Sequence, residues 1–100
     1  MPTQELETRF YQLVTTWKRE TAHLSSAARM AEHPAYQEVV ALGEAAVPLL
    51  LAELRRQPDF WFAALRQITG ENPVPPESAG KVKEMARAWV EWGRAKGYLA

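Results

Sequence analysis

Two amphipathic patterns joined by a Pro-Asp turn, within residues 41–72, constrain the fold of this chain more than any other feature. In both patterns the apolar residues recur at spacings of three and four, which places them on one face of an α-helix. The first pattern contains Val47, Leu50, Leu51 and Leu54, and the second contains Trp61, Ala64, Leu65 and Ile68. Because the two apolar faces can pack together, the segment is predicted to form a helical hairpin.

The residues at the ends of these two patterns favour the same interpretation. Gly43 interrupts the helical run before the first helix, and Pro48 falls near its first turn, where proline is tolerated. Asp59 is placed to cap the second helix, and Gly70 can end that helix in a left-handed conformation. The residues at the helix ends therefore favour the same two helices as the spacing of the apolar residues.

Two further helices, with a short helical segment between them, are predicted before the hairpin. Residues 3–24 carry a continuous apolar stripe, and residues 25–33 are rich in small side chains that favour a short helix. Pro34 disfavours helical dihedral angles at His33, so a break is expected there. Pro34 is also well placed as the first residue of another helix, which runs to Leu42.

A final helix is predicted after a proline-rich crossing segment. Three of residues 73–76 are prolines, which excludes a helix there and favours extended chain. The helix should begin at Glu77 or Ser78, run to about Lys96 and stop at Gly97. Its apolar stripe consists of Val82, Met85, Ala86, Trp89 and Gly93.

The predicted fold is therefore all-α, with about five helices in a single domain over residues 1–100. The helical hairpin is flanked by a long N-terminal helix and a Trp-containing C-terminal helix, and no stretch alternates with period two for long enough to form a strand. One hundred residues can bury one modest core. That core is expected to contain Trp17, Leu50, Leu54, Trp61, Leu65 and Trp89.

The hairpin also resembles a HEAT-like repeat, a unit of two helices with a Leu-Gly and Val-Pro-Leu-Leu opening. The resemblance, which covers about a third of the chain, rests on Leu42, Gly43, Ala46, Val47, Pro48, Leu49, Leu50, Leu54, Ala64, Leu65 and Ile68. The Trp89/Trp92 pair is similar to endings of some bacterial HEAT-like helical proteins. The resemblance implies a fold and no particular chemistry. HEAT arrays stack several units, whereas no second copy follows here at a period of about 40 residues, so the flanking helices should cap the single unit.

Composition excludes several classes of function. The chain has no cysteine, which removes disulfides, thiolate catalysis and cysteine zinc sites. Its formal net charge is zero, so no global field draws it toward nucleic acid or anionic lipid. No apolar run approaches the roughly 20 residues that span a bilayer. Without a recognisable signal peptide in residues 1–10, a cytoplasmic location is expected.

The residues that could support catalysis or metal binding do not form a complete site. Glu20 and His23 have the spacing of half a carboxylate di-iron site, but the only other histidine is His33 and no second such motif accompanies it. No nucleophile elbow or phosphate-binding glycine loop is present. The sequence therefore predicts no metal, no cofactor and no enzymatic activity.

A first candidate binding surface lies at the turn of the hairpin. Arg55 and Arg56 end the first helix, while Phe60 and Phe62 flank Trp61 at the start of the second. Adjacent helical residues are about 100° apart, so these three rings cannot all point into one stripe. Either Phe60 and Phe62 are covered on both sides as core, or they join the arginines in a partner-binding surface. Trp92 and Tyr98, near the end of the last helix, are the second choice.

A second candidate surface is a basic row on the last helix. Lys83, Arg87 and Arg94 follow one another at i, i+4 and i+11, and residues 77–100 hold five Lys or Arg against three Glu. Such a row is either an ordinary solvated face or a surface that holds a nucleic-acid backbone.

The function predicted from these features is that of a protein–protein interaction module, or a regulatory accessory protein, without catalytic activity. One alternative is a nucleic-acid-binding helical domain that uses the basic row. Another is a proteinaceous inhibitor or accessory subunit of a partner enzyme.

Overall fold

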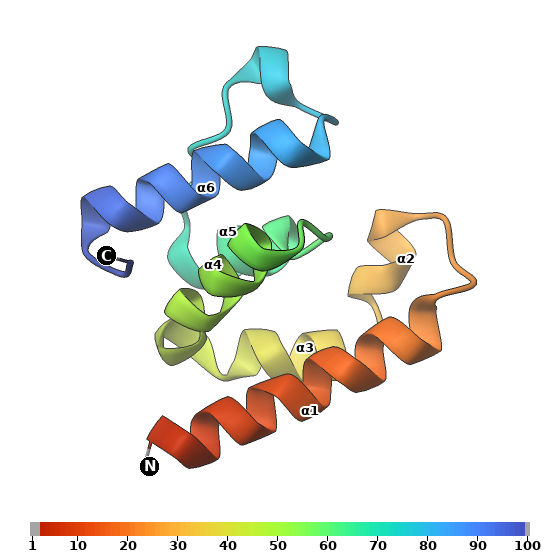
Figure 1. Cartoon of the computed structure of the whole chain (residues 1–100). Helices are drawn as coiled ribbons and strands as arrows, with labels where there is room; N and C mark the ends of the chain where they lie inside the picture. The colour runs from red at the N-terminus through yellow and green to blue at the C-terminus, as the bar shows by residue number, and fades with distance from the viewer. Residues whose placement is uncertain (1–2, 100) are drawn as a thin grey trace.

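A computed structural model of the chain describes residues 3–99, which fold into six α-helices and two short 3-10 helices with no strand (Figure 1). The elements are α1 (Thr3–Thr21), α2 (Ala27–Ala31), α3 (Pro34–Ala41), η1 (Gly43–Ala46), α4 (Val47–Arg56), α5 (Phe62–Thr69), η2 (Pro76–Ser78) and α6 (Val82–Lys96). The all-α prediction is confirmed, including the long first helix and the Trp-containing last helix.

The helices pack in an order that differs from their order along the chain. The most extensive contacts join α1 to α3, α4 to α6, and α3 to α5 (Figure 1). Helices α4 and α5 also touch, but over fewer residues. The apolar faces of the predicted hairpin are therefore buried mainly against the flanking helices.

The membrane-spanning potential of the described helices is limited to one bent pair. No single helix within residues 3–99 has the length and apolarity needed to cross a bilayer. The segments Pro34–Ala41 and Gly43–Arg56 reach that threshold only when taken together, and the chain bends by 108° between them.

One hydrophobic core lies between the helices, and it contains the six residues predicted from periodicity. Each of the six is at most 1% exposed. At its centre, Trp61 stacks on Tyr36 of α3, with ring centroids 4.9 Å apart and planes 5° apart. Trp17 of α1 lies on Trp61 with a centroid distance of 4.4 Å. Trp61 thus joins the first, third and fifth helices.

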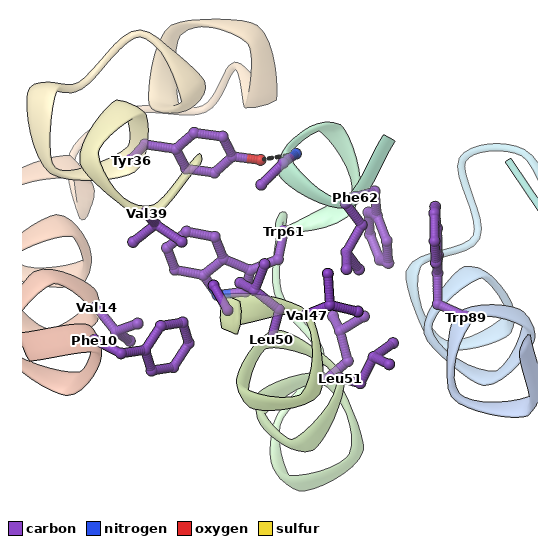
Figure 2. Close-up of a cluster of buried hydrophobic side chains, with 14 of the residues drawn as sticks. Phe10, Val14, Tyr36, Val39, Val47, Leu50, Leu51, Trp61, Phe62 and Trp89 are labelled. Atoms are coloured by element: carbon purple, nitrogen blue, oxygen red, sulfur yellow. Dashed lines mark hydrogen bonds between the residues drawn. The ribbon is translucent and has the colours of Figure 1, made fainter. Parts of the chain in front are cut away.

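The hydroxyl of Tyr36 supplies the cap at the start of α5. It accepts a hydrogen bond from the Ala64 backbone N–H at 3.0 Å, shown in Figure 2, and it donates to the Phe60 carbonyl at 2.9 Å. The prediction that Asp59 caps this helix is wrong, because its carboxylate instead accepts from the adjacent Phe60 N–H. A side chain 28 residues away in sequence therefore satisfies a buried N–H in the first turn of the helix, which has no partner within the helix.

Helix α6 begins at Val82, four or five residues later than predicted. Residues 76–78 form η2 instead, and Gly80 follows with a φ of +84°, a left-handed conformation that does not continue a right-handed helix. Gly97 ends α6 with a φ of +86°, as the sequence predicts for its C-terminus.

Replacement of Tyr36 by phenylalanine tests the role of this hydroxyl. Tyr36→Phe retains the ring stack but leaves the Ala64 N–H and the Phe60 carbonyl unpaired in a buried region, so we expect a loss of about 1–3 kcal/mol in the free energy of unfolding. Urea unfolding at pH 7 measures this loss in the free energy of unfolding. Tyr11→Phe is the matched control, because that ring is 41% exposed. Equal stability of the two variants would contradict the capping role.

The same hydroxyl should also make stability depend on alkaline pH. Burial raises the pKa of Tyr36 to about 12, from about 10 in the unfolded chain. The unfolded state therefore loses the proton first, and the contribution is complete below pH 10 and declines as the pH rises toward 12. The decline between pH 10 and 12 should be smaller in Tyr36→Phe than in the wild type.

Candidate functional site

The structure places the two phenylalanines of the hairpin turn in different environments. Phe62 is only 6% exposed and lies on the side of the core that faces Trp89 of α6 (Figure 2). Phe60 is half-buried. Of the two alternatives left open by the sequence, burial in the core therefore holds for Phe62. Consequently, Arg55, Arg56, Phe60 and Phe62 do not form one exposed patch.

The two arginines of the turn also have different surroundings. Arg56 forms an ion pair with Glu53, whose carboxylate is 1% exposed, with 2.6 Å between Nη2 and Oε1. The hydrogen bond with this carboxylate, together with its charge, raises the pKa of Arg56. Lys18 of α1 approaches the other oxygen of Glu53 at 3.6 Å. The side chain of Arg56 is thus paired with a buried carboxylate. The spacing of apolar residues in α4 does not predict that Glu53 is buried.

Arg55, by contrast, lines a groove between α4 and α6. The groove encloses about 370 Å³, and its walls are Leu54, Arg55, Pro58, Lys83, Ala86, Arg87, Val90, Glu91 and Arg94. Leu54, Ala86 and Val90 are buried and form an apolar floor, while the charged side chains are exposed at the edges. The structure thereby joins Arg55 to the three residues of the predicted basic row.

A close approach of α4 and α6 brings these residues together. Gly93 of α6 packs on Leu51 of α4, and a Cβ atom at position 93 would lie 2.5 Å from Leu51 Cδ1. Pro58, just beyond the end of α4, shares the groove with Lys83 at the start of α6. The two helices therefore run in opposite directions, which places Arg55 beside the first half of the basic row.

The groove concentrates positive charge in a chain whose net charge is zero. It holds four cations and one carboxylate, Glu91. Within residues 3–99, none of the four cations forms an ion pair. The cations elsewhere that do pair with a glutamate are Arg9, Lys18, Arg19, Arg56, Lys81 and Lys96. Positive charge at the groove is therefore available to an external anion.

The second-choice site, at Trp92 and Tyr98, is occupied by contacts within the chain. The two rings stack with a centroid distance of 5.6 Å. Trp92 Nε1 donates to Glu71 Oε1 at 3.2 Å, and the Tyr98 hydroxyl donates to Glu44 Oε1 at 2.7 Å. The latter hydrogen bond raises the pKa of Tyr98. Tyr98 thus fastens the segment after α6 to η1, and Trp92 fastens α6 itself to the chain after α5.

Of the two histidines, His33 contributes to a helix end in the described structure. His33 Nδ1 accepts the Ala35 N–H at 3.0 Å as the N-cap of α3, so Nε2 carries the proton that is shared with Glu20 at 2.8 Å. That hydrogen bond lowers the pKa of Glu20. His23 is exposed. No cluster of three or more His, Asp or Glu suited to a metal ion occurs within residues 3–99.

Comparison of the chain with profiles of known protein families, with curated proteins and with solved structures gives no match. The HEAT-like resemblance of residues 41–72 therefore stays a prediction.

The contrast between the two phenylalanines can be measured directly. Phe62→Ala removes a buried ring and should lower the free energy of unfolding by about 3–5 kcal/mol. Phe60→Ala is the matched control, and it should cost clearly less because its ring is half-buried and its backbone carbonyl still accepts from Tyr36. Thermal and urea unfolding give both values. A larger loss for Phe60→Ala would contradict the described environments.

Proposed function

We propose that the protein is a non-catalytic binding module that holds an acidic segment of a partner protein in the groove between α4 and α6. The observation that supports this proposal is a set of four cations over an apolar floor, Arg55, Lys83, Arg87 and Arg94, none of which is ion-paired among residues 3–99. The positive edges complement carboxylates, and the floor accepts the aliphatic parts of the same segment.

The spacing of the cations suits a polypeptide. Lys83 and Arg87 are separated by about 6 Å along the helix axis, because each residue advances about 1.5 Å. Alternate side chains of an extended segment are about 6.6 Å apart, since each residue advances about 3.3 Å. Acidic residues at alternate positions can therefore meet Lys83 and Arg87, whereas Arg94, about 10.5 Å beyond Arg87, matches an acidic residue about three positions further on.

The energetics require both parts of the groove. Exposed ion pairs contribute only about 0–1 kcal/mol each and weaken with salt. Four such pairs set the orientation and the association rate more than the affinity. Because the floor residues are themselves at most 8% exposed, burial of the partner's own apolar side chains against the floor must supply much of the remainder, at about 25 cal/mol per Å².

The lining of the groove favours protein over nucleic acid. It contains no aromatic side chain on which a base could stack. The apolar floor offers nothing to a phosphate backbone, whose affinity comes from ionic contacts. An accessory or inhibitory role would use the same groove, with the acidic segment belonging to an enzyme.

Charge reversal within the groove tests the proposal. Arg87→Glu should weaken binding of a fluorescein-labelled dodecapeptide with alternating glutamates by tenfold or more, because attraction at the centre of the groove becomes repulsion. Fluorescence anisotropy at 50 and 200 mM salt measures the affinity. Arg19→Glu, an exposed substitution on α1 outside the groove, is the control and should bind like the wild type.

Two results would contradict the proposal. One is equal peptide binding by Arg87→Glu and the wild type. The other is tight binding of a single-stranded DNA dodecamer that Arg87→Glu abolishes, with no peptide binding, which would establish the nucleic-acid alternative.

A further inference from the structure

An apolar pocket borders the groove at the N-terminal end of α6. It encloses about 280 Å³ between α2, α5 and the first turns of α6. Its apolar walls include Ala27, Ala28, Phe60, Phe62, Val82 and Met85. This volume lies just below the range of about 300–1,000 Å³ that is typical of small-molecule sites. It suits one side chain of a larger partner better than a free small ligand.

The pocket and the groove share no lining residue, but they come close together at two short segments. Pro58 lines the groove and Phe60 lines the pocket, and both belong to the turn between α4 and α5. Lys83 lines the groove and the adjacent Val82 lines the pocket. A single partner segment that crosses the first turn of α6 can therefore reach both.

The rim of the pocket carries positive charge, like the groove. Arg66 of α5 lines the pocket, is exposed and forms no ion pair within residues 3–99. An apolar interior with a cationic rim complements an apolar side chain that has carboxylates beside it. Met85 adds adaptability, because its unbranched thioether can adjust to side chains of different shape.

We infer, given the proposed function, that the partner segment carries one large apolar side chain next to its acidic residues. That side chain fills the pocket between Phe60 and Met85, and the acidic residues continue along α6 toward Arg94. The pocket then adds a second constraint on the direction and position of the segment, beside that of the ion pairs.

Two labelled peptides test this inference. Both carry alternating glutamates, and they differ only in one residue near one end, which is leucine in the first and alanine in the second. The comparison is made twice, once with this residue near the N-terminus of the peptides and once with it near their C-terminus. In the favourable arrangement, the wild-type protein should bind the leucine peptide about tenfold more tightly, because the pocket buries the larger side chain.

A substitution that fills the pocket provides the matched variant. Ala28 is exposed on α2 and lines the pocket, so Ala28→Leu should occupy the space without removing a core contact. It should reduce the preference for leucine to less than about threefold while it leaves the affinity for the alanine peptide unchanged. Met85→Ala, which removes a pocket wall, should also reduce the preference and serves if Ala28→Leu does not fold.

The possible outcomes separate this inference from the proposed function. Equal affinity of the wild type for both peptides, with Arg87→Glu weakening both, would overturn the apolar pocket and leave the basic groove in place. A preference for leucine that persists in both folded pocket variants would also overturn the assignment. Absence of binding to either peptide would overturn both proposals.

Discussion

The rings of Trp61, Trp17 and Tyr36 all contact one another, with Trp61 4.4 Å from Trp17 and 4.9 Å from Tyr36 between ring centroids, and the positions of three helices depend on this cluster. Aromatic pairs of this kind contribute about 0.5–1.5 kcal/mol beyond the burial of their area. The indole N–H of Trp61 is buried without a hydrogen-bond partner within residues 3–99, which costs about 1–3 kcal/mol. The stack therefore owes its strength to apolar burial, and the polar anchoring comes from the Tyr36 hydroxyl.

The hydrogen bonds of the Tyr36 hydroxyl also help to position the proposed binding surface. By capping α5 and holding the Phe60 carbonyl, Tyr36 fixes the turn that follows α4. The turn supplies Pro58 to the groove and Phe60 to the adjoining pocket. On the other side, the absence of a side chain at Gly93 lets α6 approach Leu51 of α4. The packing of the core thus determines how the four cations of the groove are arranged.

The spacing of apolar residues in the sequence predicted the helices and the core, because the apolar residues of each helix lie on the face that is buried. It did not identify the cap of α5, since the hydroxyl of Tyr36 comes from a distant helix. It placed Lys83, Arg87 and Arg94 on one row, but the addition of Arg55 depends on the antiparallel packing of α4 on α6. The burial of Phe62 likewise depends on a neighbouring helix, and the apolar pattern alone left it open.

The central claim is that a partner's acidic segment lies along α6 in the basic groove. Amide chemical shifts of the ¹⁵N-labelled protein, recorded during titration with the alternating-glutamate peptide that carries leucine, test this claim most directly. The account predicts saturable shifts at residues 54–60 and 82–94, with residues of α1 unchanged. Shifts confined to α1 or to residues 95–99, or no saturable shifts at all, would contradict it.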